Sequence, residues 1–381
     1  MTPYSLMPPF NFRFAGASLL LAATPFSVFA APPASDALAA RSAAMFNASK
    51  AVGMVVVVVT PAGVVIHGYG QDAPGSSRAP GPHSLVRIAS TSKLLAADVA
   101  LRLAAEGKLK LDDPLQRYAP PGMVVPVPAL ARPITLRDLA THTSGLPREP
   151  DLPYPADVAP YAWPTAQVRW EWLARLKHTG APGPAALYSN VGFDLLGDAL
   201  GQAAGKPYAA LLREKITTPL AMDDTTSNPT PTQCARLMQG PESGRCADTS
   251  ATAATGGVYS TPADMGTWMA YMLGLNRAHL PDPQAFKIVV QAAALESISG
   301  LDKGGPVHGI GLGWIHLAAT ASAPAIMQKT GGGLGFRSYM ALAPNARVGV
   351  FAVMTQVDQA AMTTMIRQVT ALTGELAAQA K

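Results

Sequence analysis

Residues 55–70 read VVVVVTPAGVVIHGYG. Two runs rich in β-branched residues flank a turn that carries proline and glycine, which is the pattern of a β-hairpin. Further strands are predicted near the C-terminus, at residues 311–318, 325–330, 336–343 and 348–355. Because antiparallel strands pair locally and bury one face, we expect the two ends of the chain to form one antiparallel sheet.

The middle of the chain shows helical patterns and many loops. Apolar residues recur at helical spacing from Ser90 to a stop at Gly107, and Thr135 and Thr261 are predicted helix caps. Other helices are expected at 42–53, 136–141, 166–178, 191–204, 207–216, 262–273 and 360–378. The predicted class is α/β (α+β), with a sheet lobe from 31–115 and 300–381 and a mainly helical lobe from 116–299. A cleft between the lobes is the expected place for a small-molecule site.

The first thirty residues have the pattern of a secretory signal peptide. They contain one charged side chain, Arg13, followed by an apolar run over 14–23 and by small residues before position 30. A retained membrane anchor is the alternative, although the run is short and ends near Pro25. Removal of this segment takes the net charge from +5 to +4. We therefore predict a mildly basic exported protein.

The two cysteines, Cys234 and Cys246, lie in a loop rich in proline, glycine and serine. In an exported protein such a pair is predicted to form a disulfide, and two unpaired thiols are the alternative. No histidine or acid stands at metal-ligand spacing, so no metal is expected. Basic residues form no stripe or block, which argues against a nucleic-acid partner.

Ser90 and Lys93 are the first candidate catalytic residues. Three residues apart on a helix, their side chains share a face, and the helix start offers free N–H groups around Ser90. A half-buried Lys93 would have a lowered pKa and could accept the serine proton. Read alone, the pair favours a capping serine and a solvated lysine, because Ser-x-x-Lys is a common spacing.

Tyr188 and Asn190 form the second pattern, just before the helix expected from residue 191. A tyrosine held between two lysine ammonium groups would be drawn toward phenolate and could pass protons to and from Ser90. Asn190 could donate to a substrate amide carbonyl. The alternative is a polar helix start with a packed tyrosine.

Lys329, Thr330, Gly331 and Gly332 form the third pattern, at the end of a predicted strand. The first two residues would hold a substrate carboxylate, and the glycines would let a substrate backbone approach closely. An N–H near Gly332 would complete an oxyanion hole with that of Ser90. An exposed lysine at a glycine-rich strand exit is the alternative, but the three patterns together predict acyl transfer through a serine ester.

Several stretches resemble the serine β-lactamase/penicillin-binding-protein superfamily, class C branch. They are RIASTSK at 87–93, EGKL at 106–109, DDPL at 112–115 and ITLRDLATHTSGLP at 134–147. Others are similar to its AmpH-type group of D-alanyl-D-alanine carboxypeptidases/endopeptidases, namely YAPPG at 118–122, PRE at 147–149, YSN at 188–190, GGVYSTP at 256–262 and QKTGGG at 328–333, with the two cysteines.

The resemblance implies a β-lactamase/transpeptidase-like fold and a periplasmic enzyme without a cofactor, with loose inner-membrane association left open. It implies Ser90 as nucleophile, Lys93 and Tyr188 as proton-transfer groups and Lys329 as anchor. Its implied partners are peptidoglycan stem peptides, with β-lactam antibiotics as covalent inhibitors. The stretch Thr355-Gln356-Val357 departs from the asparagine-rich pattern of class C β-lactamases, so we expect weak antibiotic hydrolysis at most.

Two other functions remain open from the sequence: a β-lactamase or small-ester hydrolase, and a penicillin-recognising or wall-binding protein without activity. His142 is expected to be structural because no second metal ligand accompanies it. The aromatic residues Tyr161, Trp163, Trp170 and Trp172 are expected either to pack in the core or to form a rim for the peptide stem.

Overall fold

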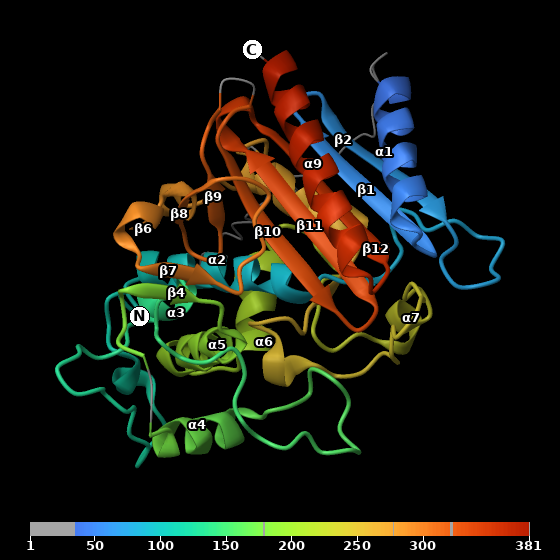
Figure 1. Cartoon of the computed structure of the whole chain (residues 1–381). Coiled ribbons are helices and arrows are strands. Elements are labelled where there is room, and N and C mark those ends of the chain that lie inside the picture. Colours follow the sequence, from blue (N-terminus) through green and yellow to red (C-terminus); the bar gives the residue numbers. More distant parts are fainter. Residues whose placement is uncertain (1–34, 178–179, 277, 321–322, 381) are drawn as a thin grey trace, which may run out of the picture. The chain divides into compact units, whose positions relative to one another are not determined.

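The computed structural model describes residues 35–380 apart from 178–179, 277 and 321–322, so the predicted signal peptide lies outside the described residues. Its main element is an eight-stranded antiparallel sheet in the order β2-β1-β12-β11-β10-β9-β8-β6. The strands are β1 (Gly53–Thr60), β2 (Gly63–Gly70), β6 (Val290–Gln291), β8 (Val307–Ile310), β9 (Ile315–Leu317), β10 (Ile326–Gly333), β11 (Phe336–Ala343) and β12 (Val348–Thr355). The prediction that both chain ends share one antiparallel sheet is confirmed (Figure 1).

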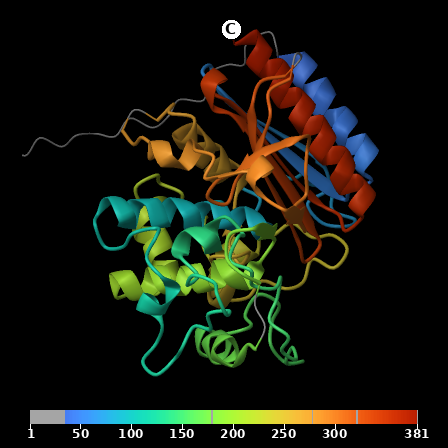
Figure 2. The same cartoon turned by 60° about the vertical axis from the view of Figure 1, so that its left-hand side comes forward.

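Strand β1 is apolar on both faces because both faces of the sheet are covered. Val55, Val57 and Val59 belong to one buried cluster, whereas Val56 and Val58 belong to a second. Helix α8 (Pro262–Met272) packs on the first face, and α1 (Ser35–Ser49) and α9 (Gln359–Gln379) pack on the second. Figures 1 and 2 both show α1 and α9 side by side over the sheet.

The remaining helices lie mostly between β2 and β6 in the chain. They are α2 (Ser92–Ala105), α3 (Leu136–Ala140), α4 (Ala166–Arg175), α5 (Asn190–Ala204), α6 (Tyr208–Leu212) and α7 (Pro231–Cys234). A π-helix, η3 (Arg213–Thr217), follows α6, and the 3-10 helices are η1 (Ala89–Thr91), η2 (Leu115–Tyr118), η4 (Ser250–Thr252), η5 (Pro283–Phe286), η6 (Ala292–Ala294) and η7 (Pro344–Ala346). Two small sheets pair β3 (Val86–Arg87) with β5 (Tyr259–Ser260) and β4 (Ala185–Leu187) with β7 (Ser297–Ser299).

Several local predictions are confirmed. The last two long strands cover the predicted residues, Thr135 forms a capping box with Asp138, and the side chain of Thr261 caps α8. Other boundaries were wrong: the first helix ends at Ser49, and the segment 207–216 divides into α6 and the π-helix. Of the strand predicted at 311–318, only Ile315–Leu317 is a strand, β9. Residues 311–314 form the turn between β8 and β9, because Gly313 has φ +74° and the Gly311 N–H bonds to the Trp314 carbonyl. The division into two lobes stays a prediction.

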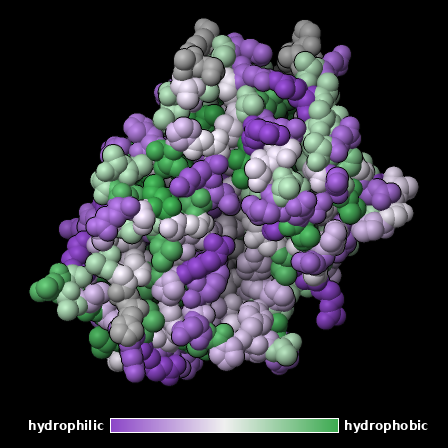
Figure 3. Space-filling view, in the orientation of Figure 1, coloured by the Kyte–Doolittle hydropathy of each residue, from purple (hydrophilic) through white to green (hydrophobic). Residues whose placement is uncertain are grey.

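In the part of the chain that the structure describes, no helix combines the length and apolar character needed to cross a bilayer. On the face drawn in Figure 3, hydrophobic residues lie in separate small areas among hydrophilic ones.

Candidate active site

Ser90 lies in η1, directly before α2, and not in the first turn of α2 as the sequence predicted. Ala89 has φ +47°, a conformation that residues with a side chain seldom adopt and that recurs at functional sites. Ser90 is half-buried, whereas Ala89, Thr91 and Ser92 are buried. The turn thus leaves Ser90 partly exposed between buried neighbours.

Lys93 is fully buried, not half-buried as expected. Its Nζ atom donates to Asn190 Oδ1 and to the Thr255 carbonyl, both at 2.7 Å, and lies 3.4 Å from Ser90 Oγ. Burial, reinforced by the charge of Lys329, holds the pKa of Lys93 well below its ordinary value. The predicted lowering is confirmed, and a lysine that loses its proton readily can act as a base toward Ser90.

Tyr188 lies among three basic side chains. Its ring centre is 4.9 Å from Lys93 Nζ, 5.2 Å from Lys329 Nζ and 4.8 Å from the Arg148 guanidinium carbon. The predicted shift toward phenolate is wrong for this structure, because burial raises the pKa of Tyr188 despite the opposing hydrogen bond with Ser90. The phenol therefore keeps its proton and can donate it.

Asn190 is the first residue of α5, whose cap is the Ser189 side chain. Its Oδ1 atom accepts from Lys93, and its Nδ2 donates to Glu149. Donation to a substrate carbonyl, as the sequence suggested, would therefore compete with Glu149. Sequence reasoning assigned no role to Thr255 or to Glu149, although Glu149 ends the stretch PRE at 147–149, because only the fold brings the two residues to Asn190.

Lys329 and Thr330 lie on β10 and are both buried. The Lys329 Nζ atom donates to the Thr330 carbonyl at 2.7 Å. Burial lowers the pKa of Lys329 to about 7, so the expected cation is only partly charged at neutral pH. A bound carboxylate would restore the charge, since an opposite charge favours the ammonium form.

Gly331 lets β10 pass close to η1. A Cβ atom at this position would lie 2.4 Å from the Ile88 carbonyl oxygen and 2.3 Å from Ser338 Oγ. Ser338 Oγ in turn bonds to the Ile88 carbonyl at 3.1 Å. The glycine of the third pattern therefore places β10 beside the Ser90 turn, while Gly332 is exposed. The predicted oxyanion hole at Gly332 and Ser90 stays a prediction.

The structure thus brings the three patterns into one site. Beside it, a cavity of about 400 Å³ is lined by Glu149, Pro150, Leu152, Tyr154, Pro160, Tyr161, Trp163, Pro164, Asn190, Asp194, Thr252, Thr255 and Leu334. The predicted aromatic cluster divides here, since Tyr161 and Trp163 line the cavity while Trp170 and Trp172 are buried on α4. Within the described residues, no group of three histidines, cysteines or acids is placed to hold a metal ion.

The sequence profile of the family named Beta-lactamase matches residues 37–374. The chain belongs to this β-lactamase family. It is 43% identical to the D-alanyl-D-alanine-carboxypeptidase/endopeptidase AmpH of Escherichia coli K12 over 350 residues, which cover 89% of this chain and 90% of AmpH.

Solved structures of the β-lactamase family have the same fold. A β-lactamase/D-alanine carboxypeptidase from Yersinia pestis, complexed with citrate, is 46% identical, with a TM-score of 0.82 over 87% of this chain and 95% of that chain. A class C β-lactamase from Rhodobacter sphaeroides matches with a TM-score of 0.67 over 88% of this chain and 98% of that chain. At 21% identity the second likeness shows the fold alone.

His142 packs behind Tyr188 in this family member. Their ring centres are 4.5 Å apart, and His142 Nδ1 accepts the Ser189 N–H at 3.1 Å. Burial and the nearby charge of Lys93 hold the pKa of His142 well below its usual value. The neutral imidazole of His142 therefore packs against the Tyr188 ring.

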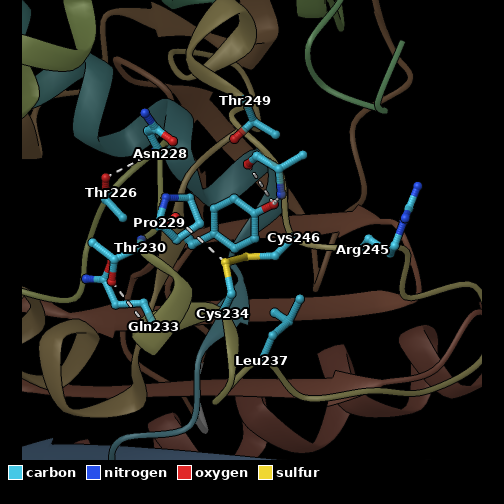
Figure 4. The surroundings of a disulfide bond; sticks show 12 residues. Thr226, Asn228, Pro229, Thr230, Gln233, Cys234, Leu237, Arg245, Cys246 and Thr249 are labelled. Carbon is cyan, nitrogen blue, oxygen red and sulfur yellow. Dashed lines mark hydrogen bonds between the residues drawn. A yellow bond between two sulfur atoms is a disulfide. The ribbon is translucent and has the colours of Figure 1, made fainter. Parts of the chain in front are cut away.

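A disulfide joins Cys234, at the end of α7, to Cys246, with 5.7 Å between the Cα atoms (Figure 4). The loop that carries Cys246 also contacts the strand before the Ser90 turn, because the Arg245 carbonyl accepts from Arg87 at 2.7 Å. Arg87 stacks on the Tyr259 ring at 4.4 Å. The bridge therefore ties α7 to the loop that contacts β3, the strand just before the Ser90 turn.

Proposed function

We propose that this chain is a serine D-alanyl-D-alanine carboxypeptidase/endopeptidase that acts on peptidoglycan stem peptides in the periplasm. The observation that carries the proposal is the position of the half-buried Ser90, whose Oγ lies 3.4 Å from the buried Lys93 and bonds to Tyr188, the ring that Lys329 also contacts. Similarity to AmpH along 89% of the chain supports the same activity.

The first half-reaction forms an ester on Ser90. Its Oγ attacks the carbonyl carbon of the penultimate D-alanine while its proton passes to neutral Lys93. The oxygen of the tetrahedral intermediate is held by N–H groups at Ser90 and Gly332. The C–N bond then breaks, and the leaving amine takes a proton from the Tyr188 phenol, which Lys93 reprotonates.

The second half-reaction uses the same groups. Water attacks the ester carbonyl, a proton returns to Ser90, and the shortened peptide leaves. Lys329, with Thr330, holds the carboxylate of the leaving residue during the first step. An endopeptidase cut follows the same course, with the amine of a cross-linked residue as the leaving group.

The contacts of the stretch Thr355-Gln356-Val357 indicate that antibiotic hydrolysis is inefficient. Thr355 Oγ1 bonds to the Gly53 N–H at 3.0 Å, and Gln356 Nε2 donates to the Lys50 carbonyl at 3.0 Å. The Val357 carbonyl accepts from Arg337 at 2.7 Å. The polar groups of this stretch therefore bond to the segment between α1 and β1 and to Arg337, and not to a drug carboxylate. We propose that β-lactams acylate Ser90 and that the resulting ester is hydrolysed slowly.

Release of D-alanine from a purified muropeptide pentapeptide tests the function. The wild type should release D-alanine, and Ser90→Ala should not, which would also exclude a binding protein without activity. Steady-state turnover of a cephalosporin should be slow. Rapid cephalosporin turnover without D-alanine release would support a β-lactamase instead.

A further inference from the structure

Arg148 lies in the loop between α3 and α4, and its backbone is bound to the start of α5. Its carbonyl oxygen accepts the Asn190 N–H at 2.8 Å and the Val191 N–H at 3.3 Å. These donors belong to the first turn of the helix, where N–H groups have no partner within the helix itself. The loop backbone is therefore fixed to the helix that begins two residues after Tyr188.

The side chain of Arg148 contacts the Tyr188 ring. Its guanidinium carbon lies 4.8 Å from the ring centre, within the range of a cation–π contact. The segment after β7 packs against the same two side chains, because a Cβ atom on Gly300 would lie 3.1 Å from Tyr188 Cβ and 3.8 Å from Arg148 Nη1. The Tyr188 N–H also bonds to the Ser299 carbonyl at 3.0 Å. Tyr188 and Arg148 are thus packed together on backbones that hydrogen bonds hold in place.

Arg148 has no acid as a partner in the part of the chain that the structure describes. The residue is exposed, and its guanidinium makes no ion pair or hydrogen bond with a described residue. The adjacent Glu149 bonds to Asn190 instead. By contrast, Arg132 and Arg169 each make two hydrogen bonds to one aspartate. An arginine that packs on a tyrosine without a carboxylate keeps its full charge for the ring.

Other groups that titrate or carry charge surround the Tyr188 ring. They are Lys93 on α2, His142, Glu149 and Tyr161 in the loop of Arg148, and Lys329 on β10, while Asp194 and Asp302 act on the two lysines. Burial lowers the pKa of Lys329 to about 7, and the charge of Arg148 adds to the lowering. A lysine can therefore lose its charge here, whereas a guanidinium stays charged. Of the three basic side chains at the ring, Arg148 is the fixed cation.

We propose that Arg148 is a positioning residue for Tyr188: its guanidinium holds the phenol ring in place and stabilises the phenolate that forms when the ring gives up its proton. The proposal rests on the proposed function, in which Tyr188 protonates the leaving amine. In that step the phenol O–H bond breaks, an N–H bond forms on the amine, and the electron pair stays on the phenol oxygen. The ring then carries negative charge, so its attraction to a guanidinium 4.8 Å from its centre increases. Lys93 then returns a proton to the phenolate.

Substitution of Arg148 tests the proposal, because the carbonyl that binds α5 belongs to the backbone and is kept in every variant. Arg148→Gln should lower kcat for D-alanine release from a muropeptide pentapeptide by about 5- to 30-fold, the range for loss of a cation–π contact, with no rise in KM. Arg148→Lys should restore most of the rate, because an ammonium group supplies the same charge. Arg175→Gln is the matched control, since Arg175 is an exposed arginine at the end of α4. It should leave kcat at the wild-type value.

A second background shows whether Arg148 acts through the phenol group. Tyr188→Phe keeps the aromatic ring but has no proton to give, so no phenolate forms. In this background Arg148→Gln should cause little further loss of kcat, because the effects of residues that act together do not add. The same loss in both backgrounds would overturn the proposal.

The pH dependence of acylation gives a readout that a purely structural role would not change. Burial and the charge of Lys329 lower the pKa of Lys93, and the charge of Arg148 adds to the lowering. Lys93 accepts the serine proton only when neutral, so the rate of acylation by benzylpenicillin falls as pH drops through this pKa. Arg148→Gln should raise the pKa of Lys93 and move the acidic limb of the profile to higher pH. Arg148→Lys and Arg175→Gln should leave the limb in place.

The outcomes separate the two proposals. A wild-type kcat and an unmoved limb in Arg148→Gln, with D-alanine still released, would overturn the role of Arg148 and leave the peptidase intact. A higher KM with unchanged kcat would also overturn it, since Arg148 would then contact the substrate instead. No D-alanine release by the wild type would count against the peptidase, and the position of the acylation limb would then decide the role of Arg148 alone.

Discussion

Two buried lysines lie near the Tyr188 ring, and the structure holds them differently. Lys93, on α2, donates to Asn190 and Thr255 at 2.7 Å, so its Nζ atom is fixed close to Ser90. Lys329, on β10, donates to the Thr330 carbonyl alone among the described residues. Burial lowers the pKa of both. The difference indicates that Lys93 is positioned to move a proton, whereas Lys329 keeps donors free for a ligand.

Of the changes predicted for the two lysines, replacement of Lys93 should lower activity the most. Lys93→Met should lower kcat for D-alanine release by about 10² to 10⁴-fold, the range for loss of a general base. The rate of acylation by benzylpenicillin, followed by stopped-flow, should fall in parallel. An acylation rate within tenfold of the wild type would show that another group takes the serine proton.

Replacement of Lys329 should instead lower kcat/KM only for substrates that end in a free carboxylate. Lys329→Met should lower kcat/KM for a carboxylate-terminated peptide by about 10 to 10²-fold, because a hydrogen bond to a charged group contributes about 1.5 to 3 kcal/mol. The matched C-terminal amide should change little. Equal losses for both peptides would contradict a role as carboxylate anchor.

Gly331→Ala would disturb the contact that holds the two lysines in one site. The added Cβ would lie 2.4 Å from the Ile88 carbonyl oxygen, so β10 or the Ser90 turn must shift. We expect a loss of about 1 to 3 kcal/mol in the free energy of unfolding, as in other overpacked sites, and weaker acylation. Gly81→Ala is the control, because its Cβ would meet nothing within 4 Å. Equal stabilities of the two variants would contradict the close approach.

The smallest effect should be seen with pH. Lys329 has a pKa of about 7 and is a cation below it, so attraction for a carboxylate weakens as pH rises through that value. The ratio of kcat/KM for the carboxylate peptide to that for the amide should fall roughly threefold between pH 6.5 and 7.5, as for a single titrating group. A ratio that is constant over this range would contradict the lowered pKa.

Sequence patterns were sufficient where local chemistry decides the structure. The β-branched run at 55–59 predicted a strand, the strand predicted at 348–355 is β12, and the proline after Thr261 predicted the start of α8. The same patterns failed at Gly313, where one residue at φ +74° turns the chain between two short strands. A helical pattern also hid the π-helix Arg213–Thr217.

The electrostatics of the site were harder to predict because they depend on burial. The sequence placed two lysines near Tyr188 but gave no measure of desolvation, which outweighs their charge and raises the tyrosine pKa. Asp194 is separated from the recognised patterns by only four residues, yet its buried, unpartnered oxygen appears only after α5 packs against its neighbours. Helical spacing from Asn190 was the one signal that could have found it.

Mass spectrometry after incubation with benzylpenicillin tests the central claim most directly. The intact protein should gain the mass of one penicilloyl group, and peptide mapping should place that group on Ser90. Ser90→Ala should gain none. An unmodified wild type, or an adduct on any other residue, would contradict the assignment of Ser90 as the nucleophile of this site.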